Sequence, residues 1–265
     1  MNLHLKQVLK QKKEFIWICL IKKRQKITKE TIKTNFMSII GYNAKSTHLF
    51  INNLSGLEFG KSLIKIREFY SNSKEYSNIF NKIIDKYDLS KKDIRKILEE
   101  TEEYNDDFIG KIERSIKNNK NKDNTNALAR KLSKHCNRES TENPKKHEKI
   151  RIEHIHNLLS DNNIEELCKN MPRIVIFLDN VPAHGTDLVK DIVKTLNIYF
   201  VYLPSYSPEF APIEGVFKII KYELRSNILK TKEEVMNKCV EVYYEKCVNS
   251  SLWLWFVERY LTIIS

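Results

Sequence analysis

Residues 173–204 read RIVIFLDNVPAHGTDLVKDIVKTLNIYFVYLP. Ile174–Leu178 is an unbroken apolar run rich in β-branched residues, which predicts a strand buried on both faces. From Thr186, which suits a helix N-cap, apolar residues recur at helical spacing as far as Leu196. Ile198–Leu203 then predicts a second strand. Strand, helix and strand in this order form a βαβ unit, so the two strands should be parallel neighbours.

Two carboxylates occupy informative places in this order. Asp179 ends the first strand, and working residues in open α/β sheets lie beyond the carboxyl ends of strands. A proline-rich connection ends at Pro212 and leads into a helix whose first turn holds Glu214. Residues 180–213, which are 34 in number, separate the two acids. Paired carboxylates at one sheet edge can hold divalent metal ions for phosphoryl transfer, and magnesium suits such an oxygen site.

The helix that follows Pro212 carries a basic stripe beside its apolar one. Lys218, Lys221 and Arg225 follow Glu214 at helical spacing. One acid followed by three bases would suit a metal ion and a phosphate backbone. A solvated helix face with a Glu→Lys pair explains the same spacing, and the helix alone does not decide between the two. The buried stripe is expected at Ile213, Val216 or Phe217, Ile220 and Leu224.

The ordered residues FLDNxxxH (177–184) and LPxYSPxxxPIE (203–214) resemble the segments that carry the second and third acids of the mariner-like DDE transposases and their prokaryotic insertion-sequence relatives. The 34-residue gap is the spacing of that superfamily. The resemblance implies an α/β, ribonuclease H-like catalytic domain and metal-dependent DNA cleavage and strand transfer during transposition. It implies that Asp179 and Glu214 bind Mg²⁺ or Mn²⁺, with Asn180 and His184 beside the site, and that Lys218, Lys221 and Arg225 contact DNA.

The same resemblance implies a partner and a location. The partner would be double-stranded DNA at transposon ends, and a homodimer is left open. The location would be cytoplasmic and nucleoid-associated in a prokaryote. Two alternatives remain: a catalytically inactive, transposase-derived DNA-binding protein, and a helical interaction protein whose resemblance is due to chance.

The family pattern also requires a first Asp on a central strand, among several antiparallel strands. We expect that strand between about residues 105 and 116, around the apolar run Phe108–Ile112, and Ser115 stands there at the family's position. Asp107 is our choice among the nearby acids. No Asp stands where the family pattern requires one. This implies that the front of the catalytic domain is partly truncated within residues 71–165, a helical and polar region. Residues 166–265 would then form the endonuclease-like domain with its C-terminal helices.

Residues 1–70 predict an all-α, helix-turn-helix DNA-binding region. Helices are expected over 28–40 and 44–54 around a turn at Gly41, and the second would expose Lys45, Thr47 and His48 to DNA. The apolar run Phe15–Ile21 is too short to span a bilayer and predicts a core helix segment.

The composition agrees with a polyanionic partner. The net charge of +12 favours DNA, although a lysine-rich proteome would also produce it. The five cysteines are odd in number and scattered, which predicts reduced thiols rather than a disulfide framework.

Overall fold

The computed structural model describes the backbone of residues 13–27, 30–41, 45–71, 73–101, 144–204 and 213–248. Side chains are described over the same ranges except at residues 13–34, 98–101 and 144. The chain forms two compact units, of which the first comprises residues 1–84 and 159–265 and the second residues 85–158. The strands are β1 (Lys13–Ile27), β2 (Glu30–Gly41), β3 (Thr47–Ile51), β4 (Arg173–Leu178) and β5 (Ile198–Tyr202). The helices are α2 (Gly56–Phe69), α3 (Lys74–Lys86), α4 (Lys91–Thr101), α7 (Pro144–Asp161), α8 (Ile164–Lys169), α9 (Asp187–Thr195), α10 (Ile213–Ser226) and α11 (Lys232–Val242), with a 3₁₀ turn η1 (Pro182–Gly185) and a π-helical turn η3 (Tyr243–Val248).

One mixed five-stranded sheet, in the order β3-β2-β1-β4-β5, organises the first unit. β1, β2 and β3 are antiparallel, whereas β4 runs parallel to β1 and β5 parallel to β4. Three antiparallel strands followed by two parallel ones is the ribonuclease H-like arrangement that the resemblance implied. The predicted βαβ unit is confirmed, because Ile174 pairs with Ile198 and α9 connects the two strands.

The two helices predicted over 28–40 and 44–54 are wrong. Residues 30–41 form β2 and residues 47–51 form β3. The core helix segment predicted at Phe15–Ile21 is also wrong, since these residues lie in β1. Residues 36–41 are all buried, so apolar side chains lie on both faces of β2 and fit helical spacings by coincidence. The predicted helix-turn-helix therefore lacks both of its helices.

The strands also lie elsewhere in the sequence than expected. The antiparallel strands that the structure describes come before residue 52, and the truncation predicted within residues 71–165 stays a prediction. The second unit, residues 85–158, is inserted between β3 with its following helices and β4. Residues 102–143, which include Phe108–Ile112 and Asp107, lie outside the described residues.

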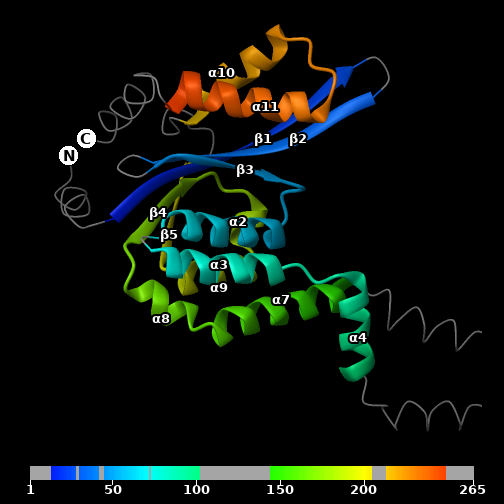
Figure 1. Ribbon diagram of the computed structural model, residues 1–265, viewed down its shortest axis with the longest axis vertical. Coiled ribbons are helices and arrows are strands. Elements are labelled where there is room, and N and C mark those ends of the chain that lie inside the picture. The colour runs from blue at the N-terminus through cyan, green and yellow to red at the C-terminus, as the bar shows by residue number, and fades with distance from the viewer. Residues whose placement is uncertain are drawn as a thin grey trace, which may run out of the picture. The chain divides into compact units, whose positions relative to one another are not determined.

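Helices cover both faces of the sheet (Figure 1). We call the side packed by α10, α11 and η3 the α10 face; Phe36 and Ile40 of β2 and Phe177 of β4 belong to its core. Tyr243 of η3 is fully buried there, and its hydroxyl lies 2.9 Å from the Ile39 carbonyl oxygen and 2.8 Å from that of Thr47. The opposite side, the α2 face, is packed by α2 and α9, which also contact each other.

The second unit has a small core of its own. Ile94 of α4 and Ile150 of α7 pack together with Leu89 and Ile97 beside them. Ser90 caps α4, because its hydroxyl accepts a hydrogen bond from the Asp93 amide at 3.1 Å. No helix within the described residues combines the length and the apolar character needed to cross a bilayer.

Candidate active site

The first predicted acid, Asp179, directly follows β4. The strand is buried along most of its length and ends at Leu178, whose carbonyl oxygen accepts a hydrogen bond from the Leu203 amide at 2.9 Å. Asp179 and Asn180 come next and are both exposed. A buried strand thus presents a solvent-facing carboxylate at its carboxyl end, as the βαβ pattern predicted.

His184 holds the turn that carries Asp179. Its ring is buried, and Nδ1–H donates a hydrogen bond to the Asp179 carbonyl oxygen at 2.9 Å. The Asp179 carboxylate oxygen Oδ1 lies 3.6 Å from the same nitrogen. Burial lowers the pKa of His184, and this effect outweighs the carbonyl and carboxylate of Asp179, which raise it. A neutral, Nδ1-protonated His184 therefore stabilises the turn that carries Asp179.

Two aromatic residues hold His184 in this position. Phe59 of α2 packs on the His184 ring with the ring centroids 4.2 Å apart. The Tyr202 hydroxyl of β5 donates to the His184 carbonyl oxygen at 3.3 Å. The sequence contained no local pattern that links Phe59 or Tyr202 to His184, because the three residues lie on three separate elements.

The second predicted acid, Glu214, lies in the first turn of α10 and is half-buried. The predicted apolar stripe is confirmed, since Ile213, Val216, Phe217, Ile220 and Leu224 are all buried. Phe177 packs against the cluster that these residues form. Because side chains alternate along a strand, Asp179 belongs to the same face as Phe177. The alternation therefore assigns Asp179 to the α10 face, and Glu214 lies in the first turn of the helix that packs on this face.

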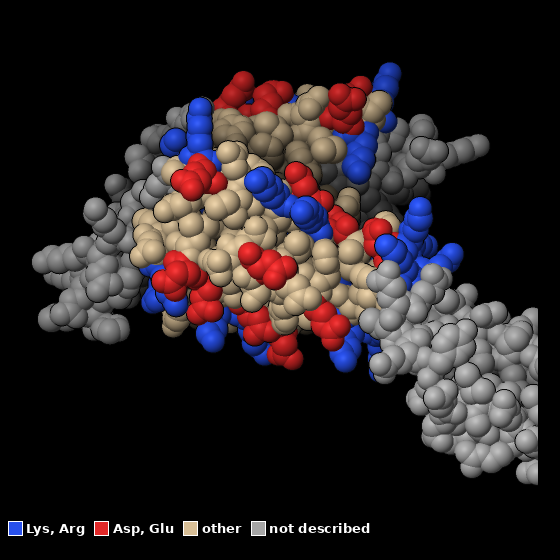
Figure 2. All heavy atoms as spheres, turned by 60° about the horizontal axis from the view of Figure 1, so that its bottom comes forward, with Lys and Arg blue, Asp and Glu red and all other residues tan. Residues whose placement is uncertain are grey.

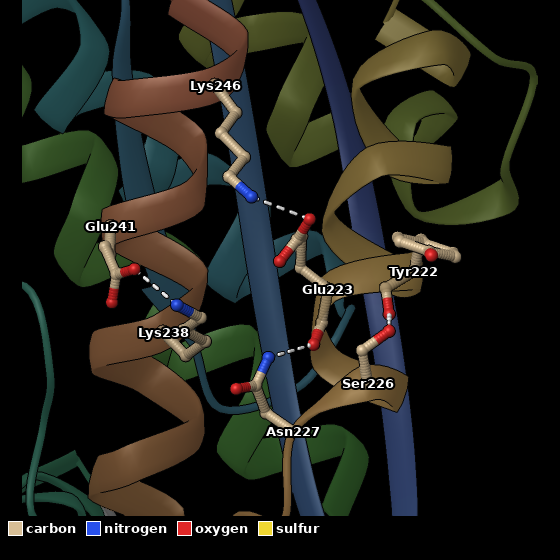
Figure 3. A network of polar contacts seen from close by, with 7 residues as sticks. All are labelled: Tyr222, Glu223, Ser226, Asn227, Lys238, Glu241 and Lys246. Atoms are coloured by element: carbon tan, nitrogen blue, oxygen red, sulfur yellow. Dashed lines mark hydrogen bonds and ion pairs between the residues drawn. The ribbon is translucent and has the colours of Figure 1, made fainter.

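The predicted basic stripe lies on the solvent side of α10. Lys218, Lys221 and Arg225 are all exposed, and the Lys221 ammonium lies 5.9 Å from the centroid of the Phe217 ring. Lys218 also lines an open groove of about 690 Å³ with Ile219, Tyr222, Glu223 and Lys246. In this groove Lys246 Nζ forms an ion pair with Glu223 Oε1 at 2.7 Å, which joins η3 to α10 (Figure 3).

The N-terminal residues predicted to bind DNA do not form a recognition helix. Lys45 is exposed just before β3, and Thr47 is the first residue of that strand. The His48 ring lies among aromatic rings on the α10 face, and its Nδ1 is 3.2 Å from the Tyr244 hydroxyl. The prediction that a recognition helix presents these three side chains to the major groove is therefore wrong.

A comparison with protein families matches residues 93–236, more than half of the chain, to the family described as "DDE superfamily endonuclease". The chain belongs to this family. The resemblance is thereby confirmed, and the matched range contains both Asp179 and Glu214. The antiparallel strands precede the matched range, so their assignment depends on the sheet order alone.

Two solved structures are similar to this DDE-family chain, both of the catalytic domain of Mos1 mariner transposase. One, with raltegravir and manganese, has 12% identity and a TM-score of 0.47, and the alignment covers 98% of this chain and 85% of the other. The other has 12% identity and a TM-score of 0.48, with 98% and 86% covered. At these values neither likeness establishes an activity. The comparison with curated proteins found no match.

The family pattern places its first acid on a central strand, and β1 is the central strand next to β4. Glu14 is the only acid of β1, and it pairs with Ile174, so it stands five residues, roughly 16 Å of strand, before Asp179. Among the described side chains, no three of His, Cys, Asp and Glu come together as a metal-binding group. Asp179 and Glu214 are the oxygen ligands that one Mg²⁺ prefers, but these residues do not fit a pair of ions, whose clamp needs a bridging ligand.

Proposed function

We propose that the chain is a DNA-binding member of the DDE endonuclease family whose strand-cleavage activity is weak or absent. The observation that carries this proposal is that β1 has no carboxylate beside Asp179. Two-metal phosphoryl transfer requires fixed ions on both the attacking and the leaving oxygen. Asp179 and Glu214 would bind one Mg²⁺ or Mn²⁺ loosely, and such an ion would supply charge neutralisation at a phosphate.

Charge supports DNA as the partner. The chain has a net charge of +12, and α10 presents Lys218, Lys221 and Arg225 to solvent directly after Glu214. Figure 2 shows another face of the molecule, where acidic and basic side chains are interspersed, so the positive excess is not gathered into one patch there. The α10 stripe is therefore our choice for the phosphate contacts.

Measured affinity for duplex DNA over a series of salt concentrations tests the binding. We expect the affinity to fall steeply with salt, because each phosphate contact releases counterions. Replacing Lys218, Lys221 and Arg225 together by Gln should reduce the slope of log K against log salt by about 3, since each of the three cations would neutralise one phosphate. A matched control replaces three exposed lysines of α8 and α9, Lys169, Lys190 and Lys194, and should change the slope little. A flat salt dependence of the unaltered chain would contradict DNA binding.

Cleavage of DNA that carries transposon ends tests the loss of activity. We expect little or no product with Mg²⁺ or Mn²⁺, and robust metal-dependent cleavage would overturn the proposal. A second candidate function, an active transposase that cleaves and transfers strands, is favoured by the family match, because the matched range includes Asp107. In that case cleavage should disappear in Asp107→Asn and in Asp179→Ala alike.

Two further parts of the proposal follow from DNA binding. Association with the prokaryotic nucleoid would result from non-specific contacts to phosphate, and imaging of a fluorescent fusion tests it. The homodimer that the resemblance left open is tested by light scattering of the purified chain with and without DNA.

A further inference from the structure

The register of the sheet identifies which position of β1 faces the candidate active site. Trp17 of β1 pairs with Phe177 of β4 in parallel. Two residues further along each strand stand Cys19 and Asp179. Paired residues of adjacent strands belong to the same face, and residues two apart share a face. Position 19 therefore lies on the α10 face, at the level of Asp179.

The other neighbour of β1 gives the same face independently. Cys19 pairs with Ser38 of β2, and Ser38 lies between Phe36 and Ile40 in the alternation of that strand. Phe36 and Ile40 are both buried in the core beneath α10. The registers with β2 and with β4 thus agree that position 19 belongs to the α10 face, whereas positions 18 and 20 belong to the α2 face.

We infer that Cys19 stands at the place of the missing third carboxylate, and that this single residue prevents Asp179 and Glu214 from forming a site for two divalent ions. This inference rests on the proposed function and extends it. A thiol is a poor ligand for hard cations, and even as a thiolate it prefers soft metals to Mg²⁺ or Mn²⁺. A carboxylate has two hard oxygen atoms and can bridge a pair of ions.

Restoring the carboxylate tests the inference through metal binding. The full chain with Cys19→Asp is titrated with Mn²⁺ and followed by calorimetry and by the decrease of the free-ion electron paramagnetic resonance signal. We expect a gain in Mn²⁺ affinity of at least tenfold over the unaltered chain and a second bound ion. Cys19→Asn, which has the same shape without the charge, should show no gain. Cys19→Asp combined with Asp179→Ala should lose it.

A second measurement guards against misfolding of the variant. Three carboxylates without a metal repel one another, so Cys19→Asp should unfold at a lower temperature than Cys19→Asn in the presence of a chelator. Added Mn²⁺ should raise the unfolding temperature of Cys19→Asp and leave that of Cys19→Asn unchanged. An equal response of both variants to Mn²⁺ would overturn the inference, as would two tightly bound Mn²⁺ ions in the unaltered chain.

Affinity for duplex DNA is measured on the same proteins, which separates the two proposals. If Cys19→Asp gains no Mn²⁺ affinity while salt-dependent DNA binding persists, the assignment of position 19 fails alone. If the unaltered chain does not bind DNA, the proposed function fails whatever the metal titration gives.

Discussion

Gly56→Ala should destabilise the first unit by forcing α2 away from α9. Gly56 begins α2, and a Cβ at this position would lie 2.6 Å from Thr186 Oγ1 and 3.0 Å from Thr186 Cγ2. Thr186 is the N-cap of α9, where its hydroxyl accepts a hydrogen bond from the Val189 amide at 3.4 Å. The short Thr side chain cannot move aside without giving up this cap, so the clash affects two helices at once.

The size of the effect follows from the parts that change. Overpacking costs about 1–3 kcal/mol, and removal of the Thr cap costs about 1 kcal/mol more. The better helix propensity of Ala returns at most about 1 kcal/mol. We therefore expect a net decrease of about 1–3 kcal/mol in the free energy of unfolding, which lowers the midpoint by about 2–4 °C for each kcal/mol in a chain of this size.

Thermal unfolding in two backgrounds isolates the cause. Gly is accepted at an N-cap at a cost of only a few tenths of a kcal/mol, so Thr186→Gly alone should have a small effect. In that background Gly56→Ala has no side chain to meet, and it should be neutral or stabilise by up to about 1 kcal/mol. An equal destabilisation in both backgrounds would refute the contact between Gly56 and Thr186 as the reason.

Three further predictions concern the packing of the α10 face and its helices. Tyr243→Phe should cost about 1–3 kcal/mol in urea unfolding, because two strand carbonyl oxygens lose their buried donor; an unchanged midpoint would contradict it. Burial lowers the pKa of His48 from its ordinary value of 6.5, so the unfolded chain takes up a proton more readily and stability falls as the pH drops below about 6.5. His48→Gln should reduce this pH dependence of the unfolding temperature but not abolish it, since His184 has a pKa lowered in the same direction. Thr231→Ala breaks the capping box with Glu234 at the start of α11 and should cost about 1 kcal/mol, whereas Thr231→Ser should cost little.

The C-terminal half of the sheet could be predicted from local patterns. β4 and β5 are short apolar runs on either side of an amphipathic helix, and the change of period marks each boundary. Asp179 and Glu214 could be chosen because strand ends and helix starts are visible in the sequence. That both acids lie near one sheet edge could also be expected, because the carboxyl ends of parallel strands meet there.

The N-terminal half could not be predicted in the same way. Residues 36–41 of β2 are all buried, so Phe36 and Ile39 fit a helical stripe as well as a strand. The parallel partner of β1 is β4, which follows the inserted unit in the sequence. No local pattern shows that Trp17 pairs with Phe177. Local patterns therefore point to residues 105–116 for the strand of the first acid, whereas β1 ends at Ile27.

The central position of β1 has a consequence for synthesis of the chain. The β1–β2 hairpin can form as soon as residue 41 has left the ribosome, but Phe177, the partner of Trp17 on the other side of β1, follows 136 residues after that point. At a translation rate of about 5–20 residues per second, this delay is roughly 7–27 s. For that time the nascent chain exposes a long strand with unpaired amide and carbonyl groups, which is a template for pairing with other chains. Holding chaperones should therefore bind nascent chains that end before residue 173 and release them once β4 has been made.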